Sequence, residues 1–182
     1  MTVKAVIDLS PVARKFILHW GEMGTRWGIN RTVAQIHALL YLAQRPMHAE
    51  EMCETLSATR SHVSVSLKEL QSWGLVKATR VLGDRRVHFE CPKDVWAMFF
   101  KVLEQRKRRE MDPTLAMLRE AAAELKKPES VDRYTQDRIK EMLDFFVAAA
   151  AWFDKLKEFS PETLEKIGRS GGGFWKFLKA RL

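Results

Sequence analysis

The feature that most constrains the fold is a change of hydrophobic period at Gly74. Before it, Val63, Leu67 and Leu70 recur at intervals of four and three residues, which places them on one face of a helix over residues 60–73. Gly74 suits the left-handed conformation in which many helices end. Any fold for this chain must therefore end a helix here and continue in another secondary structure.

A two-stranded hairpin is predicted directly after this helix. Residues 75–82 and 86–90 are rich in β-branched and aromatic side chains, which favour strands. Gly83-Asp84 lies between them, and a glycine followed by aspartate suits the positive φ of a tight two-residue turn. The hairpin is therefore expected to turn at these two residues.

The segments before residue 60 predict three more helices. Ser10-Pro11 opens the first, with Ser as N-cap and Pro at the first helical position. Asn30 caps the second, which ends at Arg45-Pro46. Residues 49–56 form a short third helix, and a small polar turn leads to the helix described above. This order, completed by the hairpin, predicts a winged helix-turn-helix at residues 49–90.

From Pro92 onward the chain is expected to be helical again. Apolar residues share helical faces up to Leu125, and Asp112-Pro113 marks a kink or a restart. A linker at residues 126–132 precedes a long helix over residues 134–158. The remaining predicted segments are a short helical piece at 161–167, a glycine hinge at Gly171–Gly173 and an amphipathic tail at 174–182.

The expected fold class is mainly α with a small β-hairpin wing: a winged helix-turn-helix with long helical dimerisation arms. Residues 1–29 are assigned to an N-terminal helix for dimerisation and a possible effector pocket. Residues 30–91 are assigned to the DNA-binding domain, and residues 92–182 to a C-terminal helical dimerisation region.

The charge of the chain indicates a polyanionic partner. Lys and Arg number 31 against 23 Asp and Glu, which gives a net charge of +8. This excess favours nucleic acid, with an anionic membrane surface as the weaker alternative. The longest apolar run, residues 145–153, is too short to span a membrane, and the N-terminus lacks a signal peptide, so we expect a cytoplasmic protein.

The polar side of the helix at 60–73 and the hairpin carry the side chains that suit DNA. An arginine can grip guanine through two hydrogen bonds, hydroxyls reach bases or phosphates, and lysine suits a phosphate. Asp84 is a candidate to orient an arginine beside it instead of contacting DNA. The predicted DNA-binding residues are Thr59, Arg60, Ser61, His62, Ser64, Lys68, Arg80, Asp84, Arg85 and Arg86.

The sequence gives less support to three other functions: an enzyme, a redox or metal sensor, and a protein-docking module. It contains no P-loop, GxSxG or HExxH motif, so an enzyme is not expected, and neither is a cofactor or a metal site. A redox or metal sensor using Cys53 and Cys91, with His48 or His88 nearby, stays open as an alternative. So does a winged helix that docks onto another protein.

The stretch HWGEMGTRWGINRTVAQIHALLYLAQRPMHAEEMCETLSATRSHVSVSLKELQSWGLVKATRVLGDRR resembles the GbsR branch of the MarR-type winged-helix regulators. The likeness runs from about Phe16 to Leu118 and is most specific in WGINR and in SVSLKELQSWGLV…GDRR. It implies a cytoplasmic homodimer that binds a pseudo-palindromic operator. It also implies a repressor of genes for uptake or synthesis of choline, glycine betaine or ectoine, and in some members a sensor of choline or a related compound.

Carried over by position, the resemblance assigns Thr59 to Ser64 and Lys68 to the recognition helix, and Asp84, Arg85 and Arg86 to the wing. A quaternary ammonium effector would need aromatic faces and a nearby carboxylate. Glycines at 21, 24 and 28 lie within or beside an aromatic stripe and suggest a close backbone approach or room for a ligand. The candidate effector residues are Trp20, Glu22, Trp27, Trp96, Phe99 and Phe100.

Overall fold

The computed structural model describes residues 9–125, 132–160, 162–164 and 166. The chain divides into two compact units, Met1–Val102 and Leu103–Leu182, which are described separately. Within the described residues, no helix combines the length and the hydrophobicity needed to cross a membrane.

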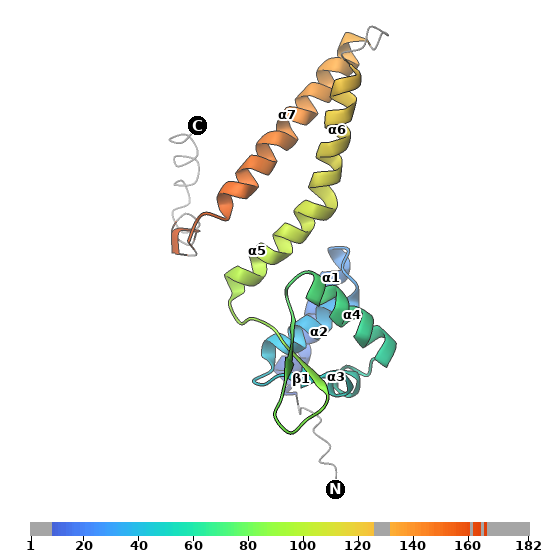
Figure 1. The fold of residues 1–182 in the computed structure, drawn as a ribbon, viewed down its shortest axis with the longest axis vertical. Coiled ribbons are helices and arrows are strands. Elements are labelled where there is room, and N and C mark those ends of the chain that lie inside the picture. Colours follow the sequence, from blue (N-terminus) through green and yellow to red (C-terminus); the bar gives the residue numbers. More distant parts are fainter. Residues whose placement is uncertain (1–8, 126–131, 161, 165, 167–182) are drawn as a thin grey trace. The chain divides into compact units, whose positions relative to one another are not determined.

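The first unit begins with four helices (Figure 1): α1 (Pro11–Arg26), α2 (Arg31–Leu42), α3 (Ala49–Leu56) and α4 (Arg60–Ser72). Side-chain oxygens cap three of them, since Ser10 accepts a hydrogen bond from the N–H of Ala13, Asn30 from Thr32, and Thr59 from His62. The predicted helices before Gly74 are therefore confirmed, with ends that differ by a few residues.

The sheet differs from the prediction in having three strands. β1 (Met47–His48), β2 (Lys77–Arg80) and β3 (Val87–Glu90) are antiparallel in the order β1-β3-β2. β1 was missed because two residues carry no readable alternation. It pairs with β3, which thereby becomes the central strand, and it ties the start of α3 to the wing.

The predicted two-residue turn at Gly83-Asp84 is wrong. The last strand pair is Arg80 with Val87, so residues 81–86 form a longer loop. Asp84 ends the ladder because its carboxylate accepts the backbone N–H of Arg86 at 2.9 Å. Gly83 does take the positive φ, 84°, that the sequence suggested, whereas Asp84 does not.

The glycines of α1 allow α1 and α2 to approach closely. A Cβ on Gly24 would lie 2.5 Å from the Cβ of Ala34, and one on Gly21 would lie 2.7 Å from the Cγ of Gln35. Gly28 has open space around it and a φ of 74°, so its role is to end the helix. The core of this unit is a cluster of buried apolar residues from α2, α3 and α4, joined by Ile17 of α1, Met47 of β1 and the segments that follow α4 and β3.

α5 (Val95–Arg106) begins in the first unit and continues into the second. There a π-helical turn, η1 (Lys107–Met111), leads into α6 (Asp112–Glu124). The helix thus restarts at Asp112, and the π-turn accommodates Pro113, which lacks the N–H that a regular helix interior requires. α7 (Arg133–Leu156) packs back along α6 (Figure 1). The predicted hinge at Gly171–Gly173, the tail and most of the predicted linker lie outside the described residues, whereas the described part of the 161–167 piece, 162–164 and 166, is helical.

Candidate nucleic-acid interface

α4 has one buried and one exposed face. Val63, Leu67 and Leu70 are at most 3% exposed and pack into the core. The candidate DNA-binding residues of this helix are all exposed: Arg60, Ser61, His62, Ser64 and Lys68. The N-terminal end of α4 carries free N–H groups and the positive end of the helix dipole, which suits a phosphate.

At the wing, the structure joins Asp84 to Arg86. The guanidinium Nε lies 2.9 Å from Oδ1 and 3.0 Å from Oδ2 of Asp84. These side-chain hydrogen bonds, with the bond from the Arg86 N–H, hold the pKa of Asp84 well below its ordinary value. Asp84 therefore orients a guanidinium, as the sequence suggested. Within the described residues, Arg80 and Arg85 are exposed and pair with no carboxylate.

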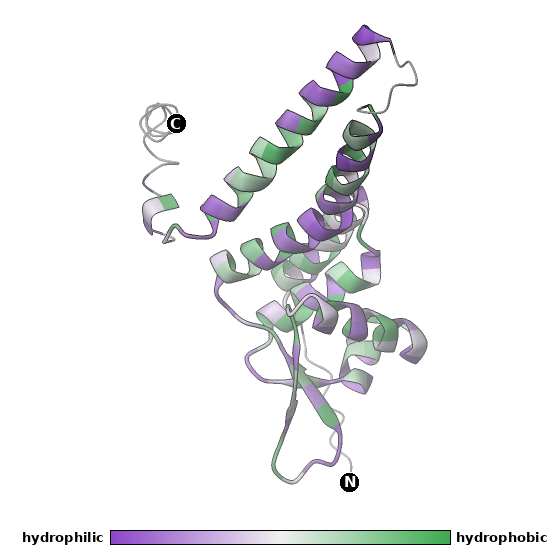
Figure 2. Cartoon of the chain, turned by 45° about the horizontal axis from the view of Figure 1, so that its top comes forward, coloured by the Kyte–Doolittle hydropathy of each residue, from purple (hydrophilic) through white to green (hydrophobic). Residues whose placement is uncertain are grey.

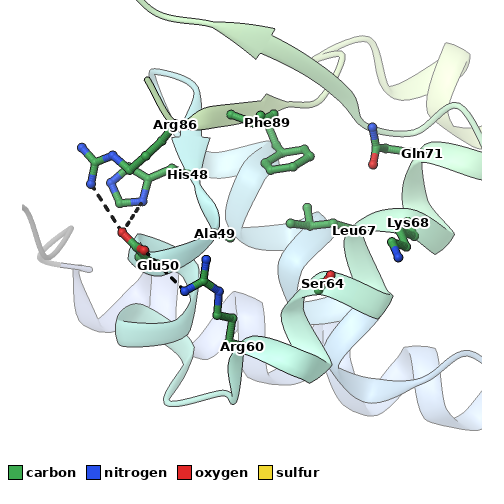
Figure 3. A pocket seen from close by; sticks show the side chains of 11 residues that line it. His48, Ala49, Glu50, Arg60, Ser64, Leu67, Lys68, Gln71, Arg86 and Phe89 are labelled. Atoms are coloured by element: carbon green, nitrogen blue, oxygen red, sulfur yellow. Dashed lines mark ion pairs between the residues drawn. The ribbon is translucent and has the colours of Figure 1, made fainter. Parts of the chain in front are cut away.

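A groove of about 380 Å³ lies between α4 and the wing (Figure 3). Arg60, Ser64 and Lys68 line one side, and Arg86 lines the other. Gln71 and Glu50 are among the lining residues that were not predicted to bind DNA. Gln71 continues the polar face of α4 and was detectable from its spacing, since it follows Lys68 by three residues. Nothing in the sequence singled out Glu50.

The start of α3 is fixed by a capping box. The His48 ring accepts the N–H of Glu51, and the Glu51 carboxylate accepts the N–H of His48 at 2.9 Å. Burial opposes ionisation of Glu51, but hydrogen bonds from the Arg45 guanidinium and the His48 N–H outweigh it and lower the pKa of Glu51. The motif has His where Ser or Thr is usual, so the sequence contained the signal in an uncommon form.

The structure brings together only some of the candidate effector residues. Trp20 lines an apolar cavity of about 210 Å³ between α1, α2 and the start of α5. Trp96, Phe99 and Phe100 instead contact one another on α5, with ring centroids 5.7–6.4 Å apart. Glu22 and Trp27 are exposed and do not line the cavity.

The cavity contains a buried histidine that the sequence analysis did not single out. The other lining residues are Phe16, Ala38, Tyr41, Val95 and Met98. His37 is 7% exposed, and its Nε2 has no hydrogen-bond partner among the described residues. Burial, together with the nearby charge of Lys93, lowers the pKa of His37 to about 4. Its ring is therefore neutral at physiological pH.

The cysteines are free, with Cys91 buried and Cys53 half-buried. Burial raises the pKa of both thiols, which lowers the reactive thiolate fraction. Among the described residues, no group of three His, Cys, Asp or Glu side chains has the arrangement that a metal ion needs. The redox and metal alternatives therefore gain no support from the geometry.

A helix-turn-helix with a basic wing defines a class of protein, the winged-helix transcription regulators. Residues 27–87 match the model of the MarR family. The chain is 27% identical over 137 residues to the HTH-type transcriptional repressor GbsR of Bacillus subtilis (strain 168), covering 74% of this chain and 76% of that protein. Over its winged helix, the chain is thus similar to MarR-family transcriptional regulators.

The fold is also found in a solved structure. A crystal structure of a transcriptional regulator superimposes with a TM-score of 0.62 at 18% identity, over 80% of this chain and 95% of that one. This match supports the predicted fold class, a mainly α chain with a small β wing.

Proposed function

We propose that the chain binds a pseudo-palindromic operator as a homodimer in the cytoplasm, with α4 in the major groove and the wing beside it. The observation that carries the proposal is the exposed row of Arg60, Ser61, His62, Ser64 and Lys68 beside a basic hairpin. One winged helix makes few contacts with DNA. The two-fold symmetry of a dimer doubles these contacts and repeats them at a spacing of one DNA turn.

Exposed apolar residues on the second unit support the dimer. Figure 2 shows hydrophobic positions recurring along α7 among hydrophilic ones. Met142 is 50% exposed, Phe145 65% and Trp152 39%, and Met117 on α6 is 53% exposed. Large apolar side chains in such numbers are typical of surfaces that another protein covers. A second copy of the chain is the occupant that we propose.

The DNA-binding proposal is tested by in vitro selection of binding sites followed by the substitution Arg60→Ala. We expect an inverted repeat from the selection. Arg60→Ala should weaken binding to it by about 1–3 kcal/mol and relax the preference at one base pair of each half-site, because a side chain that reads a base is lost. Fluorescence anisotropy measures both effects. Arg108→Ala is the matched control, since Arg108 is exposed on η1 and pairs with Glu104 at 3.3 Å. Unchanged operator binding by Arg60→Ala would favour the protein-docking alternative.

The regulated genes are proposed from similarity. The chain resembles a repressor, GbsR, and we infer that it represses genes for the uptake or synthesis of compatible solutes. The same inference makes a small quaternary ammonium compound, such as glycine betaine or choline, the effector. The aromatic cavity at Trp20 is the site that we propose for it, because aromatic faces attract quaternary ammonium groups.

Glycine betaine is expected to fit this cavity better than choline. The Lys93 Nζ lies 5.8 Å from the Tyr41 ring, so its positive charge opposes a free cation and favours a zwitterion. Millimolar glycine betaine should raise the melting temperature by about 2–4 °C for each kcal/mol by which its binding stabilises the folded protein. Trp20→Leu should abolish this shift, whereas Trp27→Leu should retain it. No shift with glycine betaine, choline or ectoine would contradict the effector proposal.

A further inference from the structure

Glu50 lines the proposed DNA-binding groove, at the end where Arg60, Arg86 and His48 lie (Figure 3). Its Oε1 is 3.9 Å from Nη1 of Arg60 on α4, and its Oε2 is 3.6 Å from Nη1 of Arg86 on the wing. The same Oε2 is 4.0 Å from Nδ1 of His48. One carboxylate on the first turn of α3 thus bridges α4 and the wing.

This bridge places a negative charge beside two arginines that we propose bind DNA. Arg86 is already held by Asp84, so two carboxylates share its guanidinium. Arg60 has an 83% exposed side chain and pairs with Glu50 across the groove. Exposed ion pairs of this kind are weak, so a phosphate or a base can displace Glu50 from either arginine. A DNA strand that enters the groove must compete with Glu50 for both.

We infer that Glu50 is a selectivity residue: it positions Arg60 and Arg86 across the groove and suppresses binding to DNA that offers phosphates alone. Binding to arbitrary sequences depends almost wholly on phosphate contacts, so competition by a carboxylate lowers it most. At an operator, Arg60 gains a base contact that offsets its separation from Glu50. This inference rests on the proposed DNA-binding function.

The test compares Glu50→Gln with Glu54→Gln, in the full-length protein. Both substitutions remove one negative charge from α3, but Glu54 makes no ion pair within the described residues. The probe is a mixed-sequence 30-base-pair duplex, titrated by fluorescence anisotropy at several salt concentrations. Compared with Glu54→Gln, Glu50→Gln should bind it about three- to tenfold more tightly and steepen the dependence of log affinity on log salt by about one unit, because an arginine is released to a phosphate.

The selected operator serves as the second probe. Its affinity should rise less, so the ratio of operator to mixed-sequence affinity should fall in Glu50→Gln. Glu50→Asp keeps the charge on a side chain too short to bridge both arginines, and it should give an intermediate ratio; this variant also guards against misfolding of the first. Equal effects of Glu50→Gln and Glu54→Gln, or weaker binding by Glu50→Gln, would overturn the inference while leaving the DNA-binding function intact. Absence of DNA binding by the wild-type protein would overturn both.

Discussion

Leu70→Ala is expected to lower the free energy of unfolding by about 2–5 kcal/mol, because it leaves a cavity in a close-packed core. Leu70 is 1% exposed on the inner face of α4. Its carbonyl also accepts the N–H of Leu75 at 3.0 Å, where the chain leaves the helix. The loss is a large fraction of the roughly 5–15 kcal/mol that stabilises a typical domain. Urea unfolding followed by tryptophan fluorescence measures it.

Val65→Ala is the matched control for this prediction. Val65 lies on the same helix but is 62% exposed, so its truncation should change the unfolding free energy by less than about 0.5 kcal/mol. Equal losses of unfolding free energy in the two variants would show that the inner face of α4 does not anchor this helix to the core. Since an unanchored helix cannot present its polar face in a fixed orientation, Leu70→Ala should also weaken DNA binding without touching DNA.

His37 is expected to make the protein markedly less stable in acid. The unfolded chain binds a proton on this ring below about pH 6.5, whereas the folded protein resists protonation until about pH 4. Folding therefore excludes a proton in that window, and stability falls as the pH decreases through it. The contribution of His37 to this loss is about 2–3 kcal/mol between pH 7 and pH 4. Urea unfolding at a series of pH values measures the curve.

His37→Leu and His37→Gln both remove the titrating group. Their unfolding free energy should therefore fall less between pH 7 and pH 4 than that of the wild-type protein. The two variants differ in polarity and packing, so a shared change identifies ionisation as the cause. His37→Leu should in addition be at least as stable as the wild type at pH 7, because it removes an unpartnered buried nitrogen. Parallel pH curves for all three proteins would refute the prediction.

Short-range interactions made much of the fold predictable. The caps at Ser10, Asn30 and Thr59 bond to N–H groups two or three residues away, so their residue types alone mark where helices begin. The buried apolar face of α4 was predictable in the same way, from helical periodicity. The hairpin strands were also predicted, but their turn was not, because the Asp84 carboxylate competes for a backbone N–H that the strand ladder would otherwise use.

The site was predictable where it lies on one element. The exposed face of α4 could be predicted from its spacing, and the link from Asp84 to Arg86 joins near neighbours in sequence. The position of Glu50 was not predictable, because it depends on how α3, α4 and the wing pack. The neutral state of His37 was equally hidden, since burial and the charge of Lys93 cause it.

The sequence by itself therefore determined the change from helix to hairpin at Gly74, the starts of the first helices and the polar face of α4. Each depends on backbone geometry and on contacts within a few residues, which local residue types specify. Only the tertiary structure decided that β1 joins the sheet, that Glu50 bridges Arg60 and Arg86, and that the ring of His37 lies in an aromatic cavity. Those features join segments far apart in the chain, and their energies depend on distance and burial, which exist only after the chain has folded.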